Sequence, residues 1–120
     1  MPARNHDLKD NLSRSREIDI TVTGRKSGRA ISIPVWFVLE QDRLYLLPVE
    51  GSDTQWYKNV LKTPAIRVSA RGAEAGLRAV RITEAAEVLS VVEKFREKYG
   101  ARDVKKYYSK LDVAVLLEVK

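Results

Sequence analysis

A short basic turn is the first segment of this 120-residue chain whose residue types could do chemistry. Residues 24–29 read GRKSGR, so two glycines bracket the first basic residues. Glycine lets a tight turn expose its backbone N–H groups, Arg25 can hold a phosphate through two hydrogen bonds, and Lys26 and Ser27 add a charge and a donor. The segment therefore predicts a phosphate-binding turn. The alternative is a solvated basic hairpin turn, and the spacing does not match the GxxxxGK[ST] pattern of a P-loop.

A second segment, residues 51–59, combines a helix start with aromatic side chains. Ser52 is followed three residues later by Gln55, which predicts a capping box at the start of a helix. The free N–H groups of a helix start can receive an anion or a carbonyl oxygen, and Trp56 and Tyr57 could flank a planar ring. For Trp56 we favour the alternative, an aromatic anchor in the core.

The chain lacks the side chains that many hydrolytic and metal-dependent sites need. It contains no Cys and a single His, His6, near the N-terminus. This composition disfavours a Cys nucleophile, a thiolate or histidine zinc site and a Ser-His-Asp triad, and we expect no metal site. If the protein is an enzyme, we expect a cofactor to supply the reactive group.

Basic residues outnumber acidic ones, with 22 Lys and Arg against 16 Asp and Glu and a formal net charge of +6. Such a balance favours anionic partners, including phosphorylated cofactors and nucleic acid. The basic, tyrosine-rich stretch 94–110 could bind nucleic acid, but the acidic residues within and beside it favour a solvated helix face. No segment approaches the ~18 apolar residues of a membrane span, and residues 1–12 lack the apolar core of a signal peptide. We therefore expect a cytoplasmic protein without a membrane span.

The hydrophobic pattern indicates the elements that must position these segments. Alternating or short apolar runs predict six strands, at residues 18–22, 31–39, 44–47, 66–70, 73–82 and 113–119. Short turns between consecutive strands indicate antiparallel pairing, and six strands with few helices predict a closed or partly closed barrel. Pro34 places its strand at an edge or a bulge. Trp36 and Tyr45 lie on adjacent strands and could line a cofactor site, although a place in the core is the favoured interpretation.

Helical spacing predicts a helix that carries Trp56 and ends before Pro64, and a short helical piece around Val104. The helix with the clearest pattern runs from Glu84 to Tyr99. Its predicted buried stripe is Ala85, Val88, Leu89, Val92 and Tyr99. We expect residues 1–17 to be a short polar lead and residues 18–120 to form one domain. The absence of alternating βαβ units and of a GxGxxG motif argues against a dinucleotide-binding Rossmann domain.

Four blocks taken together resemble the deazaflavin-dependent nitroreductase family. These blocks are TVTGRKSG at residues 21–28, PVW at 34–36, LYL at 44–46 and WYKN at 56–59. The resemblance extends from about Ile18 to Val68. It implies an α+β fold, the six-stranded antiparallel split β-barrel of pyridoxamine-phosphate oxidases with two or three helices.

The resemblance also implies where a cofactor binds. Arg25, Lys26 and Ser27 match the phosphate-binding turn of the family. Tyr107 matches a tyrosine beside the substrate pocket, where it could hydrogen-bond the substrate or donate a proton; a core tyrosine is the alternative. Three further segments match the parts of the family that contact the cofactor ring and its tail. Their predicted binding residues are Ile33, Pro34, Val35, Trp36, Pro48, Val49, Trp56, Tyr57, Lys58 and Asn59.

The function implied by the resemblance is hydride transfer from the deazaflavin coenzyme F-420, or alternatively from FMN or FAD, to a small electron-poor acceptor. A nitro compound, a quinone and an enone are all acceptors of this kind. The resemblance further implies a homodimer. Two alternatives from other classes remain, which are a protein that binds or carries a flavin-like molecule without turnover and a basic nucleic-acid-binding barrel. The second predicts steeply salt-dependent binding to oligonucleotides.

Overall fold

The computed structural model describes the backbone from Asn5 to Val119 and the side chains from Leu8 onward. His6 lies in the first helix, and its side chain is outside the described part, as are residues 1–4 and 120. The described elements follow the chain in the order α1 (Asn5–Ser13), β1 (Glu17–Thr23), β2 (Ala30–Glu40), β3 (Arg43–Leu46), the 3-10 turn η1 (Gly51–Asp53), α2 (Gln55–Lys62), β4 (Ala65–Ala70), β5 (Ala73–Ile82), α3 (Ala85–Tyr99), α4 (Ala101–Tyr107) and β6 (Ala114–Glu118).

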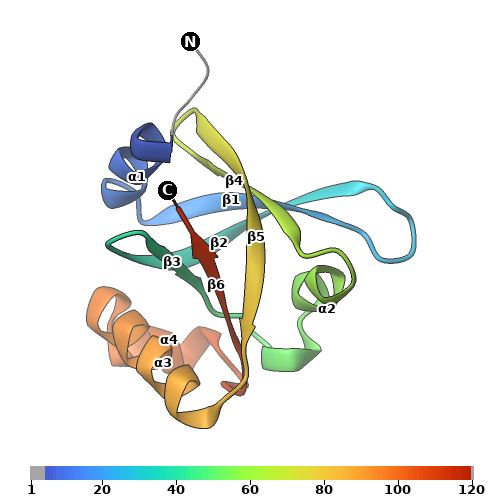
Figure 1. Cartoon of the computed structure of the whole chain (residues 1–120). Helices are drawn as coiled ribbons and strands as arrows, with labels where there is room; N and C mark the ends of the chain where they lie inside the picture. The colour runs from blue at the N-terminus through green and yellow to red at the C-terminus, as the bar shows by residue number, and fades with distance from the viewer. Residues whose placement is uncertain (1–4, 120) are drawn as a thin grey trace.

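The strands form a closed barrel in the order β1-β2-β3-β6-β5-β4 (Figure 1). Each neighbouring pair is antiparallel. This arrangement confirms the predicted six-stranded antiparallel barrel with an α+β composition. The described part of the chain contains four α-helices rather than two or three, because the polar lead includes α1 and the short piece around Val104 forms α4.

The barrel interior is filled by the apolar faces of its strands. Ile18, Ile20 and Val22 of β1 point inward and are buried, whereas the alternate residues Glu17 and Asp19 are exposed. This alternation follows from the two-residue period of a strand. The helix α1 adds Leu8 and Leu12 to the same cluster. The polar lead therefore contributes to the core of the barrel.

A second apolar cluster lies outside the barrel, between its β3–β6 side and the helices α3 and α4. The buried residues of α3 are Val88, Val91, Val92, Phe95 and Tyr99. Two of the residues predicted for the buried stripe are therefore placed wrongly, since Ala85 is exposed and Leu89 is 56% exposed. Both stripes fit a helical period, and the packing of α3 against β2 and α4 selects the one that contains Phe95.

None of the helices in residues 5–119 is both long enough and apolar enough to cross a membrane. The β1–β2 hairpin extends away from the body of the barrel, and α2 lies alongside it (Figure 1). The cavity and the basic turn described next both involve this hairpin.

Candidate functional site

A cavity of about 400 Å³ opens along the second strand of the barrel. This volume lies in the range of pockets that hold small organic ligands, ~300–1,000 Å³. Its walls come from β1, β2, α2, the β3–η1 connection and the end of α4. The lining residues are Glu17, Ile33, Pro34, Val35, Trp36, Leu47, Val49, Trp56, Tyr107 and Tyr108. Most of this surface is aliphatic or aromatic, which suits a flat apolar ring.

The cavity follows an unpaired edge of β2. The first half of β2 pairs with β1 as far as Trp36, but β3 pairs with β2 only from Phe37 onward. The backbone N–H of Phe37 donates to the Tyr99 hydroxyl, which also lies 2.6 Å from the Arg16 carbonyl just before β1. The backbone groups of Phe37 therefore face β1. Successive strand residues face opposite sides, so those of Trp36 and Pro34 face the open edge.

This edge has a specific hydrogen-bonding character. Because the pairing with β3 ends at Phe37 and Leu46, the Trp36 carbonyl lies against Leu47, and the edge beyond it presents the N–H of Trp36 and the C=O of Pro34. Pro34 itself has no N–H to leave unpaired. The pairing agrees with the edge position predicted from Pro34. A ring that enters the cavity thus meets a backbone donor and a carbonyl acceptor, in addition to the apolar walls.

Trp36 belongs to an aromatic cluster as well as to the cavity wall. Its ring stacks on Tyr99 with the centroids 4.2 Å apart and an angle of 4° between the planes. Tyr107 meets the indole edge-on at 5.6 Å, and Tyr108 lies at 6.1 Å. Burial raises the pKa of the Tyr108 hydroxyl well above its usual range, so this group stays protonated. The two interpretations of Trp36, core residue and ring contact, are compatible in this geometry.

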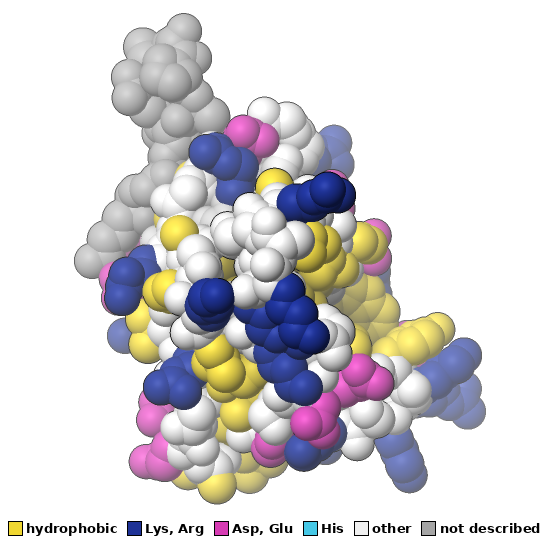
Figure 2. Space-filling model, turned by 90° about the vertical axis from the view of Figure 1, so that its right-hand side faces the viewer, with side chains coloured by type: hydrophobic (Ala, Val, Ile, Leu, Met, Phe, Trp, Pro, Cys, Tyr) yellow, Lys and Arg dark blue, Asp and Glu magenta, His cyan; other side chains and the backbone are white. Residues whose placement is uncertain are grey.

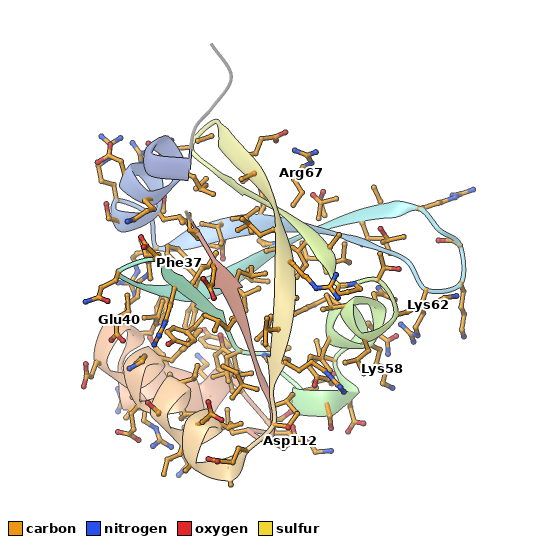
Figure 3. The ribbon with its side chains drawn as sticks, in the orientation of Figure 1. Phe37, Glu40, Lys58, Lys62, Arg67 and Asp112 are labelled. Carbon is orange, nitrogen blue, oxygen red and sulfur yellow. The ribbon has the colours of Figure 1, made fainter. Side chains whose placement is uncertain are left out.

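Two neighbouring residues of α3 hold β2 at the back of this wall. The Lys98 ammonium donates to the Phe37 carbonyl at 2.9 Å and lies 3.5 Å from the centre of the Phe37 ring. Burial, and then the positive charge of Arg16, lower the pKa of Lys98 to about 8. Burial raises the pKa of Tyr99 to about 12. Figure 3 shows Phe37 within the barrel body, on the side that faces α3. The position of Trp36 thus depends on α3.

The basic turn lies at the tip of the β1–β2 hairpin and is attached to α2. The Arg25 guanidinium donates to the side-chain oxygens of Asn59 and Gln55, each at 2.8 Å, and Lys62 donates to the Arg25 carbonyl at 2.8 Å. The two side-chain acceptors on Arg25 are neutral amides, so its positive charge is oriented but not neutralised. Lys26 and Ser27 are exposed beside it.

The turn and the cavity are connected by two rigid elements. Arg29 directly precedes β2, and Ile33 lies four positions after Arg29, which is ~13 Å at the rise of a strand. On α2, Trp56 lines the cavity while Asn59, one turn later, holds Arg25. Figure 2 views the side that presents the hairpin tip and α2, and Lys and Arg side chains gather across its middle. Lys58 and Lys62 also extend from α2 (Figure 3).

The opposite wall of the cavity is held by hydrogen bonds between the β3–η1 connection and the loop that follows α4, and we call these hydrogen bonds the clasp. The backbone N–H of Ser109 donates to the Val49 carbonyl at 2.8 Å. The Ser52 hydroxyl donates to Asp112 at 2.6 Å. Gly51 has φ +55°, and a Cβ there would lie 2.1 Å from an oxygen of Asp112, so this position requires glycine. The clasp fixes Val49 across from Tyr107.

This geometry corrects the predicted capping box. Ser52 lies in η1 and bonds Asp112 instead of the start of α2. The N-cap of α2 is Thr54, which makes no side-chain hydrogen bond to the helix. Its hydroxyl accepts the backbone N–H of Glu50 at 2.8 Å. The preference of Ser52 for a partner 60 residues away was not visible in the local pattern.

The structure divides the predicted site residues into three groups. Seven of them line the cavity together, namely Ile33, Pro34, Val35, Trp36, Val49, Trp56 and Tyr107. Arg25, Lys26, Ser27, Lys58 and Asn59 lie at the basic turn or on the adjoining face of α2. Pro48 and Tyr57 are buried away from the cavity lining.

Three residues of the cavity were not among the predicted site residues, namely Glu17, Leu47 and Tyr108. Tyr108 was assigned only to a helical piece, and Glu17 was a polar residue next to a strand. Within the described residues, no cluster of His, Asp or Glu side chains could hold a metal ion.

A family model described as "Uncharacterized protein conserved in bacteria (DUF2255)" matches residues 8–116 of the chain. No curated protein matches the chain in sequence.

Several solved structures share the fold. An F420-H2 dependent reductase (FDR-A) is 22% identical with a TM-score of 0.68, and the match covers 86% of this chain and 94% of that one. A structure described as a domain-swapped dimer is 19% identical with a TM-score of 0.68, and the match covers 92% and 96%. The heme storage protein HutZ from Vibrio cholerae is 13% identical with a TM-score of 0.70, and the match covers 100% and 92%. These neighbours support the expected resemblance at the level of the split-barrel fold.

Proposed function

This chain belongs to the DUF2255 family, and we propose that it is an oxidoreductase that takes a hydride from a deazaflavin or flavin cofactor. The observation that carries the proposal is the placement of an aromatic cavity and an unneutralised basic turn on the same strand and the same helix. A cofactor with a flat ring at one end and a phosphate towards the other matches this arrangement. The F420-H2 dependent reductase among the structural neighbours supports the choice of a deazaflavin.

The residues present fit such a cofactor at both ends. Trp36, Ile33 and Val35 offer an apolar and aromatic surface for the ring, and the open edge of β2 offers a backbone donor and an acceptor for its polar margin. Arg25 offers the guanidinium donors that its two amide partners leave free. Lys26 adds a positive charge close by. When bound, the cofactor supplies the hydride that an electron-poor acceptor receives.

The chain itself then binds, orients and excludes water. The apolar cavity walls keep water from the reacting atoms, and the fixed strand and helix hold the ring against its partner. The Tyr107 hydroxyl lines the cavity and can donate a hydrogen bond to an acceptor oxygen that gains negative charge. Tyr108 remains protonated because burial raises its pKa, so it can serve as a second donor.

We also propose a homodimer with the cavity near the interface. Val49 and Tyr107 line the cavity, yet they are 43% and 52% exposed, and Ile31 on the adjoining hairpin is 39% exposed. A second copy would cover these apolar side chains, and a domain-swapped dimer is among the structural neighbours. Sedimentation velocity at two protein concentrations tests this, and a monomer at both would contradict it.

A parallel titration of the purified chain with oxidised F-420, FMN and FAD tests the cofactor proposal. The two tryptophans of the chain, Trp36 and Trp56, both line the cavity, so their fluorescence reports directly on its occupation. We expect saturable quenching by at least one cofactor. Arg25→Ala with Lys26→Ala should weaken that binding by about tenfold or more, because charged hydrogen bonds to the phosphate are lost.

A matched control removes the same charge elsewhere. Arg102→Ala with Lys105→Ala deletes one exposed Arg and one exposed Lys on α4, neither of which lines the cavity, and should leave the affinity nearly unchanged. Binding of none of the three cofactors, or equal losses in both double variants, would contradict the proposal.

A non-catalytic carrier is the second candidate, and the heme storage protein among the neighbours shows that this fold also serves binding proteins. Such a carrier shares the cavity and the turn, so binding alone does not separate the two functions. A turnover assay does, in which the reduced cofactor is mixed with a nitro compound or a quinone. Oxidation of the cofactor that depends on the protein and falls in Tyr107→Phe supports the enzyme, and binding without turnover supports the carrier.

A further inference from the structure

Glu17 is the only charged side chain among the described residues that line the cavity. It is the first residue of β1 and pairs directly with Trp36 of β2. Directly opposite residues of an antiparallel pair project from the same face of the sheet, with their Cβ atoms ~5 Å apart. The Glu17 side chain therefore lies beside the indole that forms the cavity wall.

No cation neutralises this carboxylate within the described part of the chain. The ion pairs formed there involve other acidic residues. Arg16, which precedes Glu17 in the chain, lies 5.1 Å from the centre of the Tyr99 ring, and Lys98 donates to the Phe37 carbonyl. The Glu17 charge also contributes to the raised pKa of Tyr99, after the larger effect of burial.

This local negative charge has the opposite sign to the molecule as a whole. The chain carries a net charge of +6, which attracts anions to its surface. The basic turn would receive the phosphate of a cofactor some 13 Å along β2. At the cavity end of the same site, the Glu17 carboxylate would instead repel an anion.

We infer that Glu17 sets the charge selectivity of the cavity, so that it accepts neutral or cationic aromatic ligands and rejects anionic ones. The inference rests on the proposed function and names the class of hydride acceptor, a neutral or cationic electron-poor aromatic compound. The selectivity is repulsive, because the carboxylate acts chiefly against the wrong ligand. Repulsion between the Glu17 carboxylate and a negative charge on a ligand ~6 Å away, at a partly exposed site, should weaken the binding of that ligand about three- to tenfold relative to a neutral one.

Three ligands with the same ring test the inference, namely 4-nitrobenzylammonium, 4-nitrobenzyl alcohol and 4-nitrobenzoate. Each is titrated into the full chain without added cofactor while the quenching of Trp36 and Trp56 is followed. We expect the ammonium and the alcohol to bind about three- to tenfold more tightly than the carboxylate at low salt. The preference should shrink as salt is added.

Variants of β1 assign the preference to one side chain. Glu17→Gln should bring the three affinities within about twofold of one another, and Glu17→Lys should reverse their order. Asp19→Asn is the matched control, because it makes the same charge change on the same face of β1 but does not line the cavity.

Equal binding of the three ligands by the unmodified chain overturns the inference. An unchanged preference in Glu17→Gln, or an equal change in Asp19→Asn, does the same. If none of the ligands quenches the tryptophans, the cavity does not take a small aromatic acceptor and the inference also fails. The cofactor titration described above decides the proposed function separately, because its variants change Arg25 and Lys26 of the basic turn and leave Glu17 in place.

Discussion

The two ends of the candidate site are built in different ways. The cavity wall is assembled from several packed elements, and its central residue, Trp36, stacks on Tyr99 of α3. The basic turn is a hairpin tip whose main attachment is the contact of Arg25 with α2, while Lys26 and Arg29 are exposed.

The difference separates shape from charge. A ligand ring is recognised by a surface that also stabilises the fold, so changes there alter binding and stability together. A phosphate is recognised in part by exposed side chains that make no attachment to the fold, Lys26 and Arg29, so changes to these two should alter binding alone. If this division holds, variants of the cavity wall change stability and binding together, and variants of Lys26 and Arg29 change binding alone.

Trp36→Ala should have the largest effect, because it acts on both properties. Removing a half-buried indole deletes the stack with Tyr99, and we expect a loss of about 2–3 kcal/mol in the free energy of unfolding. Ring binding should fall by about tenfold or more. Urea denaturation and equilibrium dialysis measure the two effects. Loss of binding with unchanged stability would show that the wall is not part of the core.

Tyr99→Phe should reduce stability without removing any group that lines the cavity. The Phe37 N–H and the Arg16 carbonyl both lose their partner, which costs about 1–3 kcal/mol for buried backbone groups. Tyr107→Phe is the control, since that hydroxyl makes no hydrogen bond to another described residue, and it should leave the urea midpoint unchanged. Equal midpoints for Tyr99→Phe and the unmodified chain would show that the Tyr99 hydroxyl does not secure β2.

Lys26→Ala with Arg29→Ala should act on binding alone. Both side chains are exposed, so the free energy of unfolding should change by less than about 0.5 kcal/mol. The affinity for a phosphorylated cofactor should fall about three- to tenfold at low salt, and its dependence on salt should become shallower. Titrations at two salt concentrations measure this. An affinity that stays as salt-dependent as before would remove these two residues from the phosphate site.

The fold was largely predictable from the sequence because its signals are local. Alternating apolar residues located the strands, and short polar turns between them indicated antiparallel pairing. Pro34 indicated an edge because a proline cannot donate to a neighbouring strand. The predictions were wrong where a residue far away in the sequence determines the hydrogen-bond partner or the buried face. Ser52 bonds Asp112 across 60 residues, and the buried face of α3 is selected by strands far away in the chain.

The candidate site was predictable in its aromatic and basic parts, which carry recognisable residue types. Glu17 shows why the rest was not. An acidic residue before a strand is ordinarily solvated, and its place beside Trp36 follows only from the register of β1 and β2 and from the closure of α4 over the same edge. The residue types along the chain specify neither the register of β1 and β2 nor the position of α4 over the edge of β2.

The smallest predicted effect is a pH dependence at the wall, and it has a definite sign. Burial lowers the pKa of Lys98 in the folded protein to about 8, from the ordinary value of 10.5 that holds in the unfolded chain. Between these values the unfolded chain holds more protons at this amine than the folded one, so stability rises with pH. We expect the free energy of unfolding to increase from about pH 7.5 to about 9.5, below the range in which Tyr99 begins to oppose it. Because Lys98 is only half-buried, solvent screens the effect and the rise should be smaller than the other stability changes predicted above. Lys98→Met should flatten the increase, whereas Lys94→Met, on the same helix, should retain it. If the free energy of unfolding of Lys98→Met still rises with pH, the pH dependence belongs to another group. The contact of Lys98 with Phe37 would then make no measurable contribution to the stability of the cavity wall.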